Sequence, residues 1–323
     1  MLRHWFSYNE INWSNLSGNK SHHAVHLLSL PENFDKINWT KLSQNPFAVD
    51  LLLKHPEKIK WSSLCLNINP KAVYLILQAF KRGETKKFDW LNICRNHCPD
   101  IFPLLEYIVQ SIDNYSVRDY DEELYYLSAN PVAISLFLCP EHYEKICWTG
   151  MCMNTSKKAI ELLSKRENYH RLERHVLALN PSAFSLLLKE YEYNPERIDW
   201  SCLAFNSNPQ AIKLLEQNPD KIVWYLLTGN KSKEAFELIK KNLNMVSWTM
   251  LLDNPHALEM IQGLKYGNLN KYHWAILSSN PEIFVEWKNV KKRPFSEELL
   301  QEALNPRRVA AIYNRFGSLD GYI

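Results

Sequence analysis

The chain has 323 residues, of which 46% are hydrophobic, and its 38 Lys and Arg against 35 Asp and Glu leave a net charge of +3. So small a net charge argues against a surface that binds nucleic acid along its whole length. No apolar stretch approaches the length needed to span a bilayer, and the first residues lack the apolar run of a signal peptide. With an odd count of seven Cys, this predicts an intracellular protein with reduced thiols and no membrane partner.

One pattern recurs along almost the entire chain: a Trp, an aliphatic residue three positions later and an Asn six positions later. The pairs are Trp13 and Asn19, Trp39 and Asn45, Trp61 and Asn67, Trp90 and Asn96, Trp148 and Asn154, Trp200 and Asn206, Trp224 and Asn230, Trp248 and Asn254, and Trp274 and Asn280. Two more repeats keep Asn130 and Asn180 but have Leu124 and Arg174 at the Trp position. Self-similarity over nearly the whole chain predicts a repeat architecture.

Each repeat reads as two helices, a short one and a longer one. Residues 37–61 show the order: a short apolar stretch around Trp39, an Asn-Pro pair, and then apolar residues at helical spacing over residues 48–52. The predicted fold is all-α, a solenoid of about eleven two-helix repeats of roughly 22–34 residues over residues 1–287. If each repeat advances by about one helix diameter, the solenoid is a rod or curved superhelix on the order of 100 Å long. Residues 288–323 are expected to form a basic C-terminal cap.

The Asn-Pro pair predicts where the second helix begins, because Asn accepts a hydrogen bond from a free backbone N–H and Pro has no N–H to leave unpaired. This start signal is expected at Asn45, Asn69, Asn130, Asn180, Asn208, Asn254 and Asn280. Where two residues are inserted, Ser21, Ser156 and Ser232 are expected to cap the helix. The Asn six residues after Trp stays in place even there. We therefore predict that its side chain bonds backbone groups of its own turn.

The cysteines raise the question of a metal site, most clearly at Cys94, His97 and Cys98. The repeat register argues against it, because Cys65, Cys94 and Cys152 all lie four residues after Trp, where other repeats have Ser, Ala or Thr. We expect that position to require a small buried side chain. The paired, closely spaced cysteines of a zinc site are also missing from the sequence.

Other signs of catalysis or metal binding are equally weak. His22 and His26 lie one helical turn apart, but two ligands do not complete a site and no Asp or Glu nearby adds a third. The sequence has no Gly-rich phosphate loop, no Gly-x-Ser-x-Gly and no His-Glu-x-x-His. It therefore predicts a protein that is not an enzyme, with no catalytic or metal residues, no cofactor and no small-molecule substrate.

The repeat Ile-x-Trp-x-x-Leu-Ser-x-Asn-Pro-x-Ala-Val-x-Leu-Leu is clearest over residues 37–52 and returns over residues 198–215. This pattern resembles the tandem short repeats of many proteins of giant nucleocytoplasmic large DNA viruses. The resemblance covers about residues 11–287. Residues 303–309 are also similar to the closing segment of such proteins, although Asn305 stands where that segment often has His. The resemblance implies a viral, non-enzymatic, α-helical repeat protein.

A binding surface is expected where the repeat pattern breaks. The longest repeat lies between Trp90 and Leu127, where Pro103 is expected to interrupt the helix and an insertion near residues 101–123 places tyrosines beside charges. The candidate partner-binding residues are Tyr115, Arg118, Asp119, Tyr120 and Asp121. The alternative is a degenerate repeat with a longer loop and no binding role. A basic group after residue 287, including Lys291 and Lys292, suits either an acidic partner or a polar cap.

The sequence thus predicts a scaffold for protein–protein interaction with a viral or host partner, in the host cytoplasm or virus factory. One alternative is a structural component of the virion, a minor capsid or internal protein packaged in the particle. A second alternative, a nucleic-acid-binding helical repeat protein, needs a systematic polar pair at equivalent exposed positions. The position before the Leu-Leu pair instead has mixed charge, which disfavours phosphate contact: His26, Asp50, Tyr74, Glu161, Lys213 and Glu237.

Overall fold

The computed structural model describes residues 2–3, 6–112, 122–193, 198–257 and 269–284. The chain divides into two compact parts, His4–Ile283 and a smaller part made of Met1–Arg3 with Phe284–Ile323. In the smaller part, Leu2 and Phe284 form an isolated antiparallel bridge. Within the described ranges the chain is mostly helical and has no β-strand, which confirms the all-α prediction.

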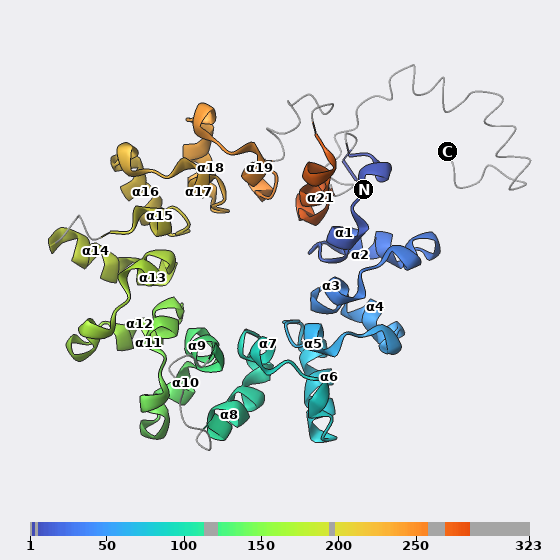
Figure 1. Ribbon diagram of the computed structural model, residues 1–323, viewed down its shortest axis with the longest axis horizontal. Coiled ribbons are helices and arrows are strands. Elements are labelled where there is room, and N and C mark those ends of the chain that lie inside the picture. The colour runs from blue at the N-terminus through green and yellow to red at the C-terminus, as the bar shows by residue number, and fades with distance from the viewer. Residues whose placement is uncertain (1, 4–5, 113–121, 194–197, 258–268, 285–323) are drawn as a thin grey trace, which may run out of the picture. The chain divides into compact units, whose positions relative to one another are not determined.

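Each sequence repeat of residues 4–283 contributes a short first helix, and we number the repeats 1–11 in chain order (Figure 1). The first helices are α1 (Trp13–Ser17), α3 (Trp39–Gln44), α5 (Trp61–Leu64), α7 (Trp90–Cys94), α9 (Glu122–Ala129), α11 (Trp148–Met153), α13 (Arg174–Leu179), α15 (Trp200–Leu203), α17 (Trp224–Thr228), α19 (Trp248–Leu251) and α21 (Lys271–Ser279). Several begin where the residue before Trp caps the helix: Asn38 Oδ1, for example, accepts from the Lys41 N–H at 3.1 Å.

Nine second helices follow in the described residues of repeats 1–9, and short 3₁₀ turns follow seven of them, α2, α4, α6, α10, α12, α16 and α18. They are α2 (His22–Ser29), α4 (Val49–Lys54), α6 (Pro70–Lys81), α8 (Phe102–Ser111), α10 (Ile134–Phe137), α12 (Lys157–Leu163), α14 (Phe184–Tyr193), α16 (Pro209–Gln217) and α18 (Lys233–Lys240). Pro103 lies in the first turn of α8 and does not interrupt it, so that prediction is wrong. A first-turn proline is tolerated because its missing N–H has no helical partner there.

The core lies between the first and second helices. The aliphatic residue three positions after Trp is almost completely buried in every repeat, from Leu16 to Leu277. The small residue that comes next is equally buried, for example Thr228 after Leu227 and Ser278 after Leu277. Apolar residues of the second helices, such as Ala72 and Ile76 of α6, cover them from the other side. First helices also contact the first helices of neighbouring repeats, so each repeat shares its core with the next.

The helix-start prediction is correct at some repeats and wrong at others. Asn69 and Asn208 cap α6 and α16, and Ser21, Ser156 and Ser232 cap their helices as predicted. Asn45 and Asn130, in contrast, precede turns, and their second helices begin only at Val49 and Ile134. The reason is that Asn45 already ends the first helix by donating its backbone N–H to Leu42 O, so the chain must turn before a new helix can begin.

The Asn six residues after the Trp position links each repeat to the one before it. In repeat 2, Asn45 Oδ1 accepts from the Phe47 N–H of its own turn at 3.0 Å, as predicted. Its Nδ2 donates to two carbonyls of repeat 1, Ser17 O at 3.2 Å and Asn19 O at 2.9 Å, which was not predicted. Carbonyls of the preceding repeat also accept from Asn67, Asn96, Asn130, Asn154, Asn180, Asn206, Asn230, Asn254 and Asn280. We call these asparagines the asparagine ladder.

The ladder continues from the last repeat into the first. Asn19 Nδ2 donates to Ser278 O and to Asn280 O, both at 3.0 Å. Beside it, the Asn15 side chain donates to Ala275 O at 2.7 Å, and α1 contacts α21 (Figure 1). Of the two shapes that the sequence suggested, a rod or a curved superhelix, an open rod would leave repeat 1 without a preceding neighbour. These bonds contradict an open rod for residues 4–283.

A second set of bonds uses the side chain four residues after the Trp position. Ser43 Oγ donates to Trp39 O at 2.7 Å and accepts from the Lys60 N–H of the next repeat at 3.0 Å. Cys65 and Cys152 occupy this position in their repeats, and backbone groups of the following repeat hydrogen-bond their sulfurs. The position therefore requires a side chain that is small and, in these repeats, able to hydrogen-bond, whereas the sequence predicted only the small size.

Candidate functional site

The five residues predicted to bind a partner, Tyr115, Arg118, Asp119, Tyr120 and Asp121, lie between α8 and α9 and outside the described residues. The basic residues that follow residue 287 also lie outside them. A candidate surface must therefore come from the helices themselves.

The first helices have a second face, opposite the one that packs on the second helices of the described residues. Residues three and four positions after Trp point into the core, so residues one, two and five positions after it lie on the opposite side, given 3.6 residues per turn. At the second of these positions Ser63, Gly150 and Val176 are buried. We call this side the free face. Along it, the residue just before each ladder asparagine is at least partly exposed in all eleven repeats, and we call these residues the free-face row: Gly18, Gln44, Leu66, Arg95, Ala129, Met153, Leu179, Phe205, Gly229, Asp253 and Ser279.

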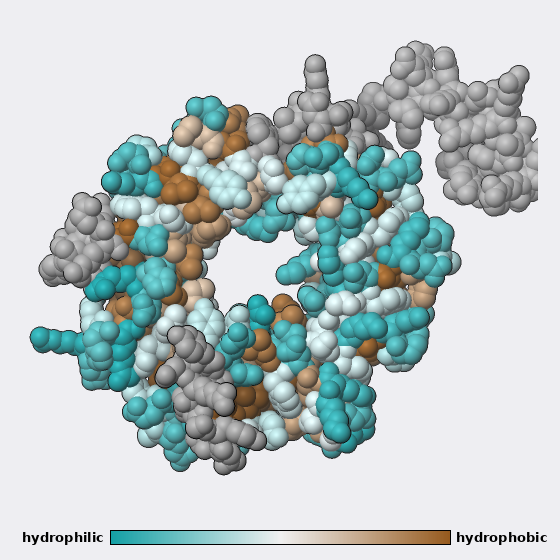
Figure 2. All heavy atoms as spheres, in the orientation of Figure 1, coloured by the Kyte–Doolittle hydropathy of each residue, from teal (hydrophilic) through white to brown (hydrophobic). Residues whose placement is uncertain are grey.

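The row is apolar in repeats 6–8, where it reads Met153, Leu179 and Phe205. Phe205 is 43% exposed, and Tyr225 on the free face of repeat 9 is 59% exposed. A Cβ added at Gly229 would lie 3.6 Å from the Phe205 ring and 2.7 Å from the Met250 methyl group, so these side chains border one patch. Figure 2 shows hydrophobic residues beside α15 and α17 around the open centre of residues 4–283. Exposed apolar patches of this kind mark interaction sites.

Repeats 1–4 have a mostly polar free face whose side chains bond one another or the neighbouring backbone. The Lys41 ammonium donates to Asn15 Oδ1, and Asn38 Nδ2 donates to Ser14 Oγ at 2.8 Å. Asn92 Nδ2 donates to Ser62 O of the preceding repeat at 3.0 Å. The corresponding side of Figure 2, beside α1 and α3, is largely hydrophilic. The free face thus changes from polar to apolar along the chain.

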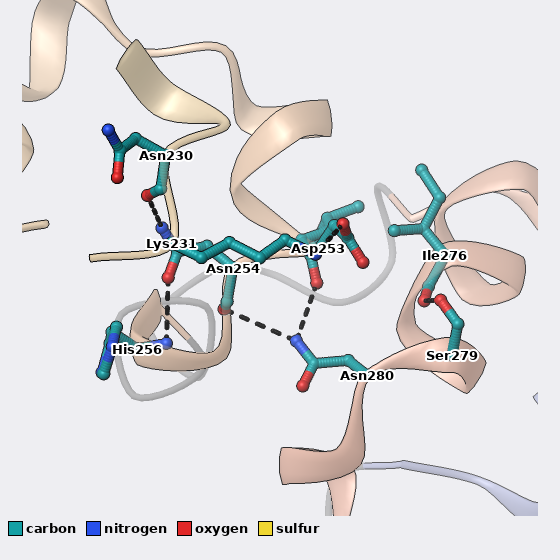
Figure 3. Close-up of polar contacts among 9 residues, drawn as sticks. Asn230, Lys231, Asp253, Asn254, His256, Ile276, Ser279 and Asn280 are labelled. Atoms are coloured by element: carbon teal, nitrogen blue, oxygen red, sulfur yellow. Dashed lines mark hydrogen bonds and ion pairs between the residues drawn. The ribbon is translucent and has the colours of Figure 1, made fainter. Parts of the chain in front are cut away.

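Charges are rare on the free face. Apart from His175, its titratable charges are Lys41, Arg95 and Asp253. Asp253 pairs with Lys231 at 2.7 Å, next to the ladder bond from Asn280 to Asn254 O (Figure 3). The Arg95 guanidinium lies 4.6 Å from the centre of the Tyr126 ring and pairs with no carboxylate of the described residues. Lys41 likewise pairs with no carboxylate of the described residues, but its ammonium is hydrogen-bonded to Asn15 Oδ1, whereas the Arg95 guanidinium is stacked on a ring.

The absence of a metal site was predicted from the cysteine register, and the structure shows where the residues in question lie. Cys94 and Cys98 are buried, and burial lowers the pKa of His97 between them. His22 and His26 are exposed, and the His22 ring packs on Phe47 with ring centres 4.7 Å apart. Among the described residues no group of three or more His, Cys, Asp or Glu side chains is placed to hold a metal ion.

Thiol labelling tests the structural role of the cysteines. Burial raises the pKa of Cys65 and of Cys152 to about 11, so at pH 8 both remain thiols, whereas Cys139 is exposed. We expect a maleimide to label Cys139 quickly in the native protein and Cys65 and Cys152 only after unfolding, because the thiolate is the reactive form. Mass spectrometry of the labelled peptides gives the order. Rapid native labelling of Cys65 would contradict its burial between repeats.

The outer side of repeats 1–3 has one shallow pocket of about 320 Å³. It is lined by His22, Phe47, Asp50 and Lys71, among others. Lys71 pairs with Asp50 at 2.7 Å and lowers the pKa of that carboxyl. The two opposite charges that line the pocket therefore neutralise each other.

No helix within the described ranges combines the length and the apolar character that crossing a membrane requires. The chain was also compared with protein-family models, with curated proteins and with solved structures, and none of the three comparisons finds a match.

Proposed function

We propose that this chain is a non-enzymatic helical-repeat scaffold, a solenoid of eleven repeats closed on itself, that binds a protein partner. The observation that carries the proposal is the asparagine ladder, which runs through all eleven repeats and returns from Asn280 to Asn19. In an open solenoid the terminal repeats lack a neighbour and need capping. Closure removes both ends. It also gives the free face a fixed geometry on which a partner can bind in a defined orientation.

The composition of the free face supports a protein partner. Interface centres are poor in charge and rich in aromatic residues, Met and Arg. The free face has this composition, with Met153, Phe205, Tyr225 and Arg95, whose guanidinium stacks on Tyr126. A nucleic acid would instead require several Lys and Arg to neutralise its phosphates. Lys41 and Arg95 are the two cations that the described free face offers, so we favour protein over nucleic acid.

The biological setting of the proposal comes from the resemblance to the repeat proteins of giant DNA viruses. On that basis the scaffold acts on a viral or host protein in the host cytoplasm or virus factory. A virion component is the alternative, and the two differ in where the chain and its neighbours are found.

Crosslinking mass spectrometry tests the scaffold. The tagged chain is crosslinked during infection, purified, and its neighbours are mapped, with purified virus particles treated in parallel as the control sample. We expect one protein at a fixed ratio from infected cells, with crosslinks to lysines of residues 6–283. Fixed stoichiometry with shell proteins inside particles would instead support the virion component. If neither sample yields a crosslinked protein, the scaffold proposal fails.

A further inference from the structure

The free-face row of repeats 6–8 forms a continuous series of apolar side chains. Met153, Leu179 and Phe205 each precede a ladder asparagine, and Asn180 reaches back to Asn154 O at 3.0 Å. Asn180 also donates to Cys152 O at 2.8 Å, and Asn206 donates to the equivalent carbonyl, Ala178 O, at 2.8 Å, so these three repeats share one backbone arrangement. Their row side chains therefore face the same way at intervals of one repeat. Toward the start of the chain the row continues through the small Ala129 to Arg95.

The interval between these side chains suits an extended peptide. Packed helices lie roughly 8–10 Å apart. A polyproline II segment has three residues per turn and a rise of about 3.1 Å, so every third side chain returns to the same side after roughly 9 Å. A peptide laid across the first helices could then meet successive row positions with every third side chain.

The positive charge of Arg95 favours a peptide that has a carboxylate at the end nearest repeat 4. Arg95 lies two repeats before Met153 and is held over Tyr126 with no carboxylate partner in the described part of the chain. Stacking on the ring leaves the N–H groups at the edge of the guanidinium free to donate two hydrogen bonds to a carboxylate. At the other end, Asp253 is already paired with Lys231.

We propose that the free face of repeats 4–8 docks an extended segment of the partner protein, with apolar side chains at every third position on Met153, Leu179 and Phe205 and a carboxylate on Arg95. This inference rests on the proposed scaffold function and specifies the chemistry of its partner. The Phe205 ring provides the largest apolar contact of the row and is the anchor of the site. The docked segment lies across the first helices, and its carboxylate fixes the register.

Fluorescence anisotropy with designed peptides tests the docking. The probe is a labelled peptide with three leucines at every third position, prolines and serines between them, and aspartate pairs about six residues beyond the outer leucines on both sides. One control peptide has lysines for the aspartates, and the other has its three leucines side by side. We expect the full chain to bind the probe at least about tenfold more tightly than either control, because each control loses one of the two recognised features.

Variants of the chain assign the contact to residues. Phe205→Ser should weaken probe binding about tenfold, whereas Tyr74→Ser, which removes an exposed aromatic ring from α6, should not change it. Arg95→Glu should reverse the preference toward the lysine-flanked peptide, whereas Arg166→Glu in a connecting turn should leave the preference unchanged. Failure to bind the probe, or equal binding by Phe205→Ser, would overturn the docking.

The outcome for docking can be separated from the outcome for the scaffold. If infected-cell crosslinking recovers the same partner with wild-type chain and with Phe205→Ser, the scaffold stands and the docking row is wrong. If no partner is crosslinked and no peptide binds, both proposals are wrong. A helical peptide that binds in place of the extended probe would likewise contradict the extended docking.

Discussion

Replacing Gly150 with alanine is expected to destabilise the protein by about 3 kcal/mol, at the upper end of the cost of overpacking. Gly150 lies in α11, where the helix packs directly on α9. A Cβ at this position would lie 2.2 Å from the Tyr125 carbonyl oxygen and 3.0 Å from the Tyr125 carbonyl carbon. These are backbone atoms, so no side chain can turn away, and the two helices must separate. Urea unfolding followed by Trp fluorescence measures the change.

Gly229→Ala is the matched control. Gly229 is also at least half-buried in a first helix or its end, but a Cβ added there would approach a side chain and not backbone atoms. Its Cβ would lie 2.7 Å from the Met250 methyl group, which is the end of a flexible side chain. We expect a cost within about 1 kcal/mol, since Met250 can adopt another rotamer. Similar unfolding midpoints for Gly150→Ala and Gly229→Ala would contradict the close backbone contact between α9 and α11. Repeat arrays need not unfold in two states, so the whole transition should be compared as well as its midpoint.

The helical class and the buried positions could be predicted because they depend on local patterns. The aliphatic residue three positions after Trp is buried in each repeat, since helical periodicity places it on one side with the apolar residues of the second helix. The serine caps at Ser156 and Ser232 were also predictable, because a cap depends on residues within the same turn.

The bonds between repeats could not be predicted in the same way. Asn67 could be assigned to its own turn from sequence, and it does accept there from the Asn69 N–H at 3.0 Å. Its two bonds to Ser43 O and Asn45 O cross a gap of more than twenty residues and depend on how repeats stack. The return of the last repeat to the first depends on a small rotation between repeats that accumulates along the array, and no local pattern specifies it.

The candidate surface does not lie where the repeat pattern breaks, which is where the sequence led us to expect a binding site. The free-face row lies inside the pattern, one residue before each ladder asparagine, where the sequence changes from Gln44 to Met153 and Phe205. This position is partly exposed in every repeat, and its residue changes from polar to apolar along the chain. That change is the feature of the sequence that could have indicated the surface. The contact role predicted for the insertion near residues 101–123 stays a prediction, because its candidate residues lie outside the described part of the chain.

Replacing Asn19 with alanine is expected to destabilise the protein by about 1–3 kcal/mol, the cost of leaving buried polar groups unpaired. Asn19 is fully buried, and its loss removes the donors to Ser278 O and Asn280 O. Asn67→Ala removes the equivalent donors to Ser43 O and Asn45 O inside the array, and it also removes the acceptor of the Asn69 N–H, whereas Asn19 Oδ1 is buried without a partner. The cost of Asn19→Ala should therefore be somewhat smaller than that of Asn67→Ala but of the same order. In an open solenoid the first repeat would have no preceding carbonyls, and Asn19→Ala would cost far less than Asn67→Ala. The comparison therefore tests closure itself.

Hydrogen exchange locates the damage, and a surface asparagine is the control. Because stability in repeat arrays is a sum of nearest-neighbour terms, Asn19→Ala should speed exchange of backbone amides in α1 and α21 before those in α11. Asn92→Ala removes an exposed bond to Ser62 O and should shift stability by no more than about 0.5 kcal/mol. If Asn19→Ala unfolds like Asn92→Ala and leaves exchange in α21 unchanged, repeats 1 and 11 are not joined in solution. The free face would then belong to an open array, and the docking surface would lack the fixed geometry that closure provides.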